Sequence, residues 1–123
     1  MSEPEAKRCV TCGREMQWRR KWARTWDQVK YCSKACRGGP GQIGQALEDA
    51  IVALLAERRS GATICPSEAA RRVDAARIDA LMEPTRCAAR RLEAAGKLDI
   101  VQKGKIVDPS TAKGPIRLRV RVR

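Results

Sequence analysis

Apolar residues after position 42 recur at the spacing of amphipathic helices. Over residues 42–59 they return every three or four positions, which predicts a first helix with one buried face. The inner positions of this helix are Ile43, Leu47, Ile51, Leu54 and Leu55. After a very short strand at Thr63-Ile64, Pro66 marks the start of a second helix. Ser67 is its expected N-cap, because a hydroxyl oxygen can accept a hydrogen bond from the first turn.

The periodicity changes towards the C-terminus. A third helix is predicted to run to Ala95 from a start near Asp79 or at Pro84. Residues 98–108 then have the pattern of a β-hairpin with a Lys-Gly turn, and residues 116–122 alternate apolar and arginine side chains as in a strand. Three helices followed by a basic hairpin are the element order of a winged helix-turn-helix, which predicts an α+β fold.

One Gly- and Pro-rich stretch looks like a linker between two parts of the chain. We therefore expect a small module over residues 1–37, a linker over 38–42 and a winged-helix-like domain over 43–123. The first part is too small to bury an adequate apolar core, so a bound metal would have to compensate.

Two cysteine pairs lie within this first module. Two residues lie between Cys9 and Cys12, three lie between Cys32 and Cys36, and nineteen residues separate the two pairs. Two such knuckles can present four thiolates to one tetrahedral Zn²⁺, and a four-sulfur set leaves no open position for catalysis. The spacing therefore predicts a structural Zn²⁺ site. A disulfide framework would need a secreted chain with a signal segment, and a redox CxxC would need a thioredoxin-like context; neither pattern is visible.

The chain is strongly basic, with 26 Lys and Arg against 14 Asp and Glu and a net charge of +12. Such a charge favours a polyanionic partner, with nucleic acid as the first choice. The excess is shared, at +6 in residues 1–41 and +6 in residues 42–123. No apolar run approaches the length of a membrane span, so we expect a soluble, cytoplasmic protein with no membrane partner.

Tryptophans recur every fourth residue in the first module, next to a cluster of cations. On a helix the indoles would follow one face and form a stacking platform for unpaired bases beside a cationic groove. The alternative is that the indoles are the core of the module, packed on the zinc knuckles. The residues of this group are Trp18, Arg19, Arg20, Lys21, Trp22 and Trp26.

Two arginines share one face of the predicted third helix. Arg86 and Arg90 lie one turn apart, as on the recognition helix of a winged helix, where they would contact a base edge or a phosphate. The alternative is a solvated charged face, or one paired with Glu93.

The predicted C-terminal strand carries a row of arginines on one side. Side chains two residues apart on a strand are about 7 Å apart, close to the phosphate spacing of a nucleic acid, and like charges in a row need an anion or acidic partner. The alternative is that the cations protect an edge strand from aggregation. The candidate contacts are Lys103 and Lys105 of the hairpin and Arg117, Arg119, Arg121 and Arg123 of the strand.

Two sets of motifs resemble known families. The first set, Cys9-Val10-Thr11-Cys12-Gly13-Arg14 and Tyr31-Cys32-Ser33-Lys34-Ala35-Cys36-Arg37, closely resembles domain-of-unknown-function family 2256. That family is a short bacterial module with four cysteine ligands, and its second half also looks like treble-clef or zinc-knuckle proteins. The second set, which includes Ile64-Cys65-Pro66-Ser67-Glu68 and Gly114-Pro115-Ile116-Arg117, is similar to family 3253, understood as a small winged-helix-like domain. The resemblances imply a fold and no function.

The sequence thus predicts a non-enzymatic, zinc-stabilised nucleic-acid-binding protein, with regulation as one role. No catalytic residue is assigned, because the chain has no His, no Ser-His-Asp or Cys-His arrangement and no phosphate loop. The alternative from a different class is an adaptor that binds an acidic protein partner, since a winged helix does not by itself confer DNA binding.

Overall fold

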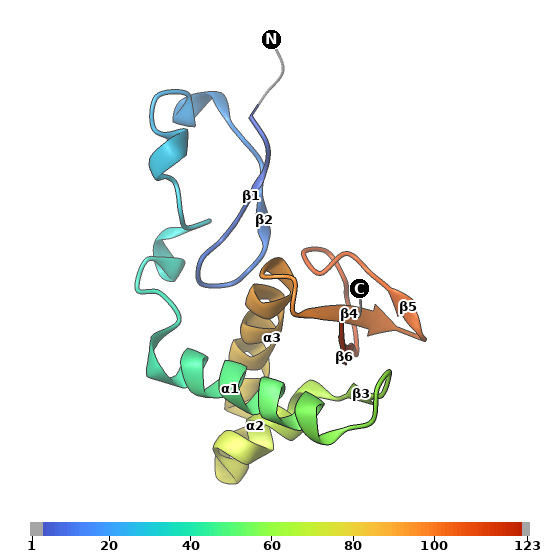
Figure 1. The fold of residues 1–123 in the computed structure, drawn as a ribbon. Helices are drawn as coiled ribbons and strands as arrows, with labels where there is room; N and C mark the ends of the chain where they lie inside the picture. Colours follow the sequence, from blue (N-terminus) through green and yellow to red (C-terminus); the bar gives the residue numbers. More distant parts are fainter. Residues whose placement is uncertain (1–3, 122–123) are drawn as a thin grey trace.

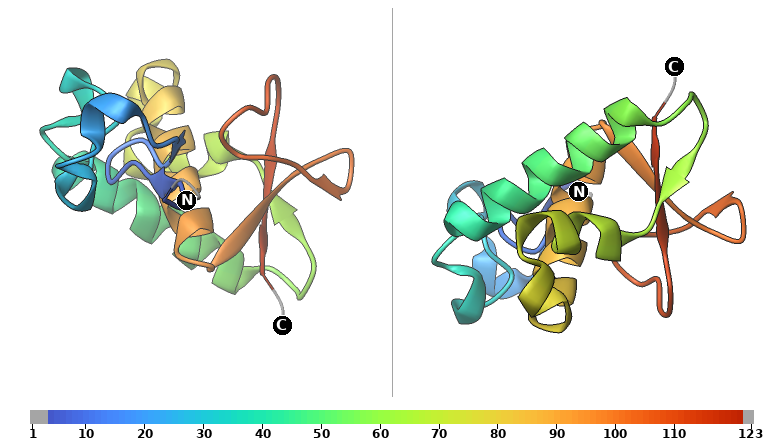
Figure 2. Two further views of the ribbon diagram at one scale, coloured as in Figure 1. Left: turned by 90° about the horizontal axis from the view of Figure 1, so that it is seen from above. Right: turned by 90° about the horizontal axis from the view of Figure 1, so that it is seen from below.

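The computed structural model describes residues 4–121 as an α+β fold in which a small N-terminal module stands on a body of helices and sheet (Figure 1). The module begins with a hairpin of β1 (Lys7–Arg8) and β2 (Glu15–Met16). The body contains the helices α1 (Gly41–Glu57), α2 (Pro66–Val73) and α3 (Ile78–Ala94). Figure 2 shows the helices between the N-terminal module on one side and the sheet on the other.

The first helix forms where the apolar spacing predicts it. α1 buries Leu47, Ile51, Leu54 and Leu55 as expected. Ile43, the first predicted inner residue, is 45% exposed, so that prediction is wrong. The inward position at the start of α1 is occupied by the neighbouring Gly44, whose carbonyl oxygen accepts a hydrogen bond from α3.

The second and third helices differ from their predictions at their starts. The N-cap of α2 is Cys65, so the prediction of Ser67 is wrong. The Glu68 carboxylate accepts a hydrogen bond from the Cys65 backbone N–H at 2.8 Å. This bond gives the N-cap residue's own N–H a partner, as the side chain at the third helical position does in a capping box. After the 3-10 turn η4 (Ala75–Arg77), α3 starts close to Asp79 and continues through Pro84.

The sheet is antiparallel and has the strand order β3 (Thr63–Ile64), β6 (Arg117–Val120), β4 (Leu98–Gln102), β5 (Lys105–Ile106). The hairpin between β4 and β5 turns at Lys103 and Gly104, which both have positive φ angles, as a two-residue hairpin turn of the matching twist requires. The arginine-bearing strand β6 pairs with β3 on one side and β4 on the other. It is an inner strand, so the edge-protection alternative is wrong.

The core of the body lies where the three helices meet the inner face of the sheet. Its largest fully buried side chains include Leu47, Ile51, Ile64, Leu98, Ile100 and Leu118. These residues come from α1 and from the adjacent strands β3, β6 and β4, so the core joins the helices to the sheet. None of the helices in residues 4–121 has the length and apolar character needed to cross a membrane.

The helix predicted over the three tryptophans does not form. The segment makes two short 3-10 turns instead, η1 (Arg20–Trp22) and η2 (Trp26–Gln28). The chain has to reverse within this segment to bring the second cysteine pair back to the first, and a short isolated helix has little stability of its own. The predicted single face of indoles is therefore absent from the described segment.

Candidate metal centre

Four cysteines that are far apart in sequence converge at the base of the N-terminal module. Their Sγ atoms all lie within 4.8 Å of one another, and the set consists of Cys9, Cys12, Cys32 and Cys36. The Sγ of Cys32 lies 3.5 Å from that of Cys12 and 3.7 Å from that of Cys36, well beyond the roughly 2.05 Å of a disulfide bond. The four sulfurs surround a common centre and can hold a metal ion, as their spacing predicts.

The first cysteine pair lies in the turn between β1 and β2. The Cys9 backbone N–H donates to the Arg14 carbonyl oxygen at 2.8 Å, and the Gly13 N–H donates to the Cys9 carbonyl oxygen at 2.9 Å. Gly13 has a φ of +77°, a conformation that a residue with a side chain rarely adopts. The turn thereby directs both sulfurs to the same side.

The second pair reaches the first because the chain returns alongside it. The Val10 N–H donates to the Lys30 carbonyl oxygen at 2.9 Å, and the Cys32 N–H donates to the Cys9 sulfur at 3.4 Å. Cys36 ends the short 3-10 turn η3 (Lys34–Cys36). Cys9 and Cys12 are buried, whereas Cys32 is exposed, so the centre has one face towards solvent.

The thiols of the cluster influence one another's ionisation. Burial raises the pKa of Cys9, but hydrogen bonds from the backbone N–H groups of Cys12, Cys32 and Thr11 outweigh it and lower the value to about 6. Desolvation and the neighbouring thiols raise the pKa of Cys32 to about 12, and desolvation also raises that of Cys12. Cys9 therefore ionises readily, whereas Cys12 and Cys32 resist ionisation. This is expected for clustered thiols, because neighbouring thiolates repel one another unless a cation lies between them.

The tryptophans pack against the metal centre. Trp26 is 7% exposed and forms a small core with Cys9, Cys12 and Met16. Trp22 is half-buried and stacks on Trp26, with ring centroids 5.6 Å apart. For Trp26, therefore, the core alternative is the correct one, because the module has few other large apolar residues to bury.

Two arginines of α3 attach the metal centre to the body. Arg90 Nε donates to the carbonyl oxygen of Cys12, and one terminal nitrogen of Arg91 donates to that of Thr11, each at 2.6 Å. Arg91 also forms an ion pair with Glu48 of α1 at 2.6 Å. The cysteine turn thus lies directly on α3, and the same arginine reaches a second helix.

This docking changes the interpretation of the arginines on α3. Arg90 is 5% exposed and pairs with Glu83 at 2.9 Å, so the prediction that it contacts nucleic acid from an open helix face is wrong. The cause is that the N-terminal module covers this face. Arg86 is half-buried and donates to the Gly114 carbonyl oxygen at 3.3 Å, and it is the less constrained of the two.

The arginines of β6 and Arg121, which directly follows this strand, also have contacts within the protein. Arg121 donates to the Asp99 carboxylate at 2.8 Å and to the Glu93 carboxylate at 3.2 Å, so its guanidinium already has acidic partners within the body and its role as a phosphate contact stays a prediction. Arg117 donates to Thr63 at 2.8 Å but remains exposed. Arg119 is half-buried and lies opposite Asp99 in the sheet. Arg123 lies outside the described residues.

The remaining predicted cations are exposed on two separate surfaces. Lys103 and Lys105 lie on the hairpin of β4 and β5, and Arg20 extends from the N-terminal module. Arg19 and Lys21 lie over the Trp22 ring, with their charged groups 5.8 Å and 5.0 Å from its centroid. Trp18 is half-buried against the small core of the module.

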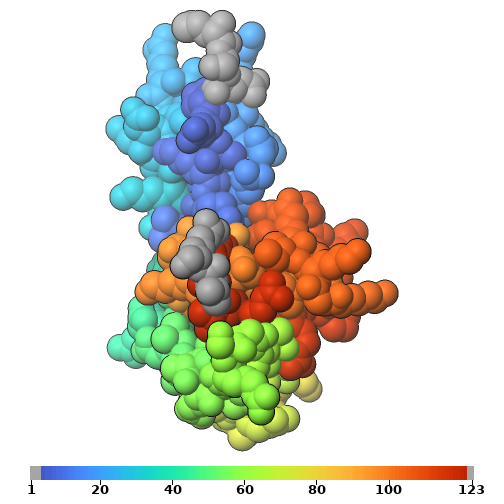
Figure 3. Space-filling model, turned by 45° about the vertical axis from the view of Figure 1, so that its right-hand side comes forward, coloured from blue at the N-terminus to red at the C-terminus, as the bar shows by residue number. Residues whose placement is uncertain are grey.

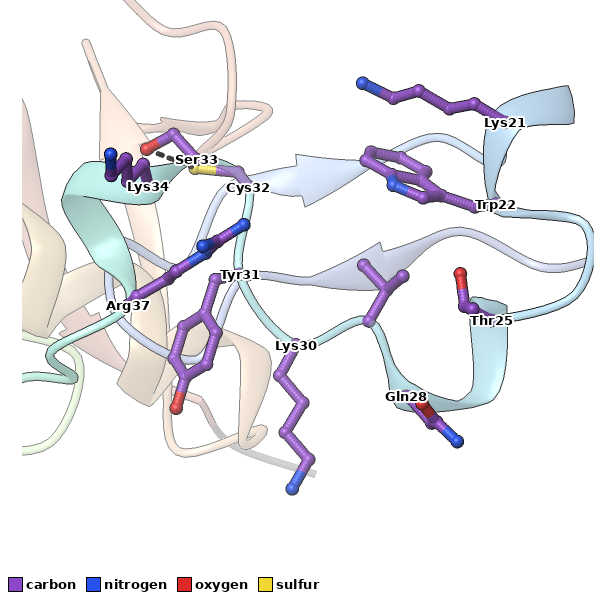
Figure 4. A pocket seen from close by; sticks show the side chains of 11 residues that line it. Lys21, Trp22, Thr25, Gln28, Lys30, Tyr31, Cys32, Ser33, Lys34 and Arg37 are labelled. Atoms are coloured by element: carbon purple, nitrogen blue, oxygen red, sulfur yellow. Dashed lines mark hydrogen bonds between the residues drawn. The ribbon is translucent and has the colours of Figure 1, made fainter.

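The structure also places together residues that the sequence analysis did not single out. An open groove of about 460 Å³ lies beside the metal centre, between the Trp22 turn and the second cysteine pair (Figure 4). Its walls add one aromatic ring and three cations to the predicted Lys21 and Trp22: Lys30, Tyr31, Lys34 and Arg37. The available signal was that these residues interrupt and flank the second cysteine pair, but only the fold brings them to the same groove as Trp22.

Two family models match the chain. Residues 44–121 match the family described as "Protein of unknown function (DUF3253)", and residues 2–39 match the family described as "Uncharacterized protein conserved in bacteria (DUF2256)". Both matches confirm the predicted resemblances and their order along the chain. A search of curated proteins found no match.

Proposed function

The chain belongs to the DUF3253 family, whose description assigns no function, and we propose that it is a non-enzymatic nucleic-acid-binding protein whose N-terminal module is held by Zn²⁺ and carries the main contact surface. The supports for this proposal are the chemistry of the four cysteines, the distribution of free cations and the position of the module on the body.

Zn²⁺ is the ion that the cysteine cluster fits best. Zinc binds thiolate sulfur at about 2.3 Å in a tetrahedron, and the edge of such a tetrahedron is about 3.8 Å long. The sulfur separations of 3.5 Å and 3.7 Å agree with that edge. A four-sulfur site has no position for substrate or water, which supports a structural metal and a binding role rather than catalysis.

The observation that carries the proposal is the different use of cations in the two parts of the chain. In the body, five arginines form ion pairs with acidic residues of the same body: Arg58, Arg72, Arg90, Arg91 and Arg121. In residues 4–37 the only basic side chain in an ion pair is Arg8, which reaches Glu93 of α3 at 2.6 Å. The exposed basic residues of the module are Arg14, Arg19, Arg20, Lys21, Arg24, Lys30, Lys34 and Arg37.

Lys and Arg side chains without an acidic partner in the protein are available to bind the phosphates of a nucleic acid. Their binding releases the counterions held by those phosphates, which favours association. Figure 3 shows the N-terminal module projecting from the body, so that much of its surface faces solvent. The described part of the body also exposes eight basic residues outside ion pairs, and these are spread over residues 59–117, whereas the eight of the module lie within residues 14–37. The module therefore offers the more concentrated cationic surface.

The body has the element order of a winged helix-turn-helix, and we propose that it is one. In that fold the third helix normally enters the major groove. Here the metal centre covers the Arg90 face of α3, which favours contact through the module and through Lys103 and Lys105 of the hairpin instead. The winged-helix part then acts as a platform that orients the module.

The test is fluorescence anisotropy of labelled duplex DNA, single-stranded DNA and RNA of equal length with zinc-loaded protein, titrated with salt. If four phosphates are contacted, affinity should fall about 50-fold or more between about 50 and 200 mM salt. Affinity that does not respond to salt for any of the three ligands would contradict the proposal.

The alternative is an adaptor that uses the same cations to bind an acidic protein. Its signature would be a stoichiometric partner that survives nuclease treatment, together with no binding of purified nucleic acid at low salt. Such a result would show that the cationic surface of the module binds an acidic protein rather than nucleic acid.

A further inference from the structure

We infer that the groove beside the metal centre binds an unpaired nucleotide of single-stranded nucleic acid, with the base against Trp22 and the phosphate against the cations of the opposite wall. This inference rests on the proposed function and specifies its ligand and its site.

The groove combines the two kinds of group that a single strand needs. Its aromatic residues, Trp22 and Tyr31, are both half-buried, which leaves part of each ring accessible. Nucleobases stack on such rings only when they are unpaired, because in a duplex their faces are covered by neighbouring bases. The groove volume of about 460 Å³ lies within the range of small-ligand sites.

The charge of the groove has one sign. Its ionisable side chains other than the Cys32 thiol and the Tyr31 phenol are cations, and no carboxylate lines it among the described residues. Lys30, Lys34 and Arg37 are exposed and take part in no side-chain hydrogen bond or ion pair within residues 4–121. Their charges are therefore free to meet a phosphate.

The groups face each other across the groove. Figure 4 shows the Trp22 indole pointing into the space from one side and the Arg37 guanidinium pointing into it from the other. They come from η1 and from the residue that follows η3. Cys36 of η3 belongs to the cysteine cluster, and Trp22 packs against the small core that contains Cys9 and Cys12. We therefore expect the site to depend on the metal for its shape rather than for chemistry.

Lys21 and Arg19 both lie over the Trp22 ring, with their charged groups 5.0 Å and 5.8 Å from its centroid. A base stacks on an aromatic ring more strongly than an exposed ammonium does, and the lysine side chain is flexible. Both side chains are exposed, so Lys21 and Arg19 would move off the ring when a base binds and would each be able to contact a phosphate instead. Their present positions therefore do not block the site.

The test compares two variants that each lose three positive charges. The groove variant combines Lys30→Ala, Lys34→Ala and Arg37→Ala, and the control combines Arg59→Ala, Arg71→Ala and Arg77→Ala, which are exposed residues at the far end of the body. Affinities for oligo(dT) and for a duplex of equal length are measured by anisotropy with zinc-loaded, full-length protein. Metal content is checked for each variant.

We expect the wild-type protein to bind oligo(dT) at least about fivefold more tightly than duplex, as stacking of one base allows. The groove variant should bind oligo(dT) about tenfold or more weakly than the wild-type protein, and the control variant less than about threefold more weakly. In addition, oligo(dT) should quench tryptophan emission in the wild-type protein and much less in Trp22→Leu, which keeps apolar volume next to Trp26.

Three results would overturn the inference in distinguishable ways. Equal binding of duplex and single strand, with a salt response, would leave the proposed function in place and remove this site. Equal losses in the two charge variants would also remove the site. No binding of any nucleic acid by the wild-type protein at low salt would remove the proposed function together with the inference.

Discussion

The Nε atom of Arg90 donates a hydrogen bond to the backbone carbonyl oxygen of Cys12 at 2.6 Å, across 78 positions of sequence. The bond joins a metal-binding turn to the third helix of the body. Both groups are buried, so neither has water as a substitute partner. The metal centre and the body are therefore expected to stabilise each other.

Replacing Arg90 with alanine should reduce the free energy of unfolding by about 2–3 kcal/mol, because a buried, charge-assisted hydrogen bond is lost and the Cys12 carbonyl keeps no partner. Arg86→Ala is the matched control on the same helix. Its more exposed guanidinium makes one longer bond of 3.3 Å, so its replacement should cost about 1 kcal/mol or less. Urea unfolding of the zinc-loaded proteins measures both values, and equal losses would contradict the docking role.

Gly13 should not tolerate a side chain. A Cβ atom at this position would lie 2.4 Å from the Cβ and 2.7 Å from the backbone carbonyl carbon of Arg90. Gly61→Ala is the control, since Gly61 also has a positive φ but nothing lies within 4 Å of its added Cβ. The control should cost about 1–2 kcal/mol from backbone conformation alone, and Gly13→Ala should cost clearly more. Thermal unfolding of the two variants compares them, and similar losses would show that the close approach is unimportant.

Removal of the metal should unfold the N-terminal module and leave the body folded. The module has only a small core around Trp26, whereas the body buries apolar residues from three helices and the sheet. A strong chelator should shift tryptophan emission to the red and open residues 9–36 to proteases, with helical circular dichroism largely retained. Unchanged emission and unchanged cleavage would contradict the metal assignment.

Metal affinity should increase steeply with pH. The pKa values of Cys12 and Cys32 are raised above the ordinary thiol value, so both groups are protonated near neutral pH and must release protons when metal binds. Higher pH removes the competing protons, and the logarithm of affinity should rise by about two or more per pH unit between about 6 and 8. Below about 6 the slope should increase further, because Cys9 also becomes protonated. Competition with a chromophoric chelator measures the slope, and a value below one would contradict this cluster.

Arg119 of β6 and Arg121, which directly follows this strand, should differ in their importance for stability. Arg121→Ala leaves the partly buried Asp99 carboxylate without its cation and removes one of the two arginines that pair with Glu93, which should cost about 2–3 kcal/mol. Arg119→Ala removes a side chain for which no hydrogen bond or ion pair is found in residues 4–121, and should change stability by about 0.5 kcal/mol or less. Chemical unfolding distinguishes them, and a larger loss for Arg119→Ala would reverse this assignment.

Several elements could be predicted from local pattern. The inner face of α1, the short strand at Thr63-Ile64 and the hairpin turn at Lys103-Gly104 follow from apolar spacing and turn chemistry within a few residues. The tryptophan segment could not be predicted in the same way. Its four-residue spacing suits a helix, but closure of the metal centre requires the chain to reverse there.

The amino-acid sequence by itself determined the four-cysteine set and most elements of the body, because ligand spacing and hydrophobic period act over short distances along the chain. Only the tertiary structure decided which cations are free. Arg90 donates a hydrogen bond to Cys12, 78 residues away, and Arg121 donates one to Asp99, 22 residues away. Lys30 and Arg37, in contrast, remain exposed in the groove beside Trp22. Charge pairing depends on contacts between distant segments, so a positive surface can be located only after the chain has folded.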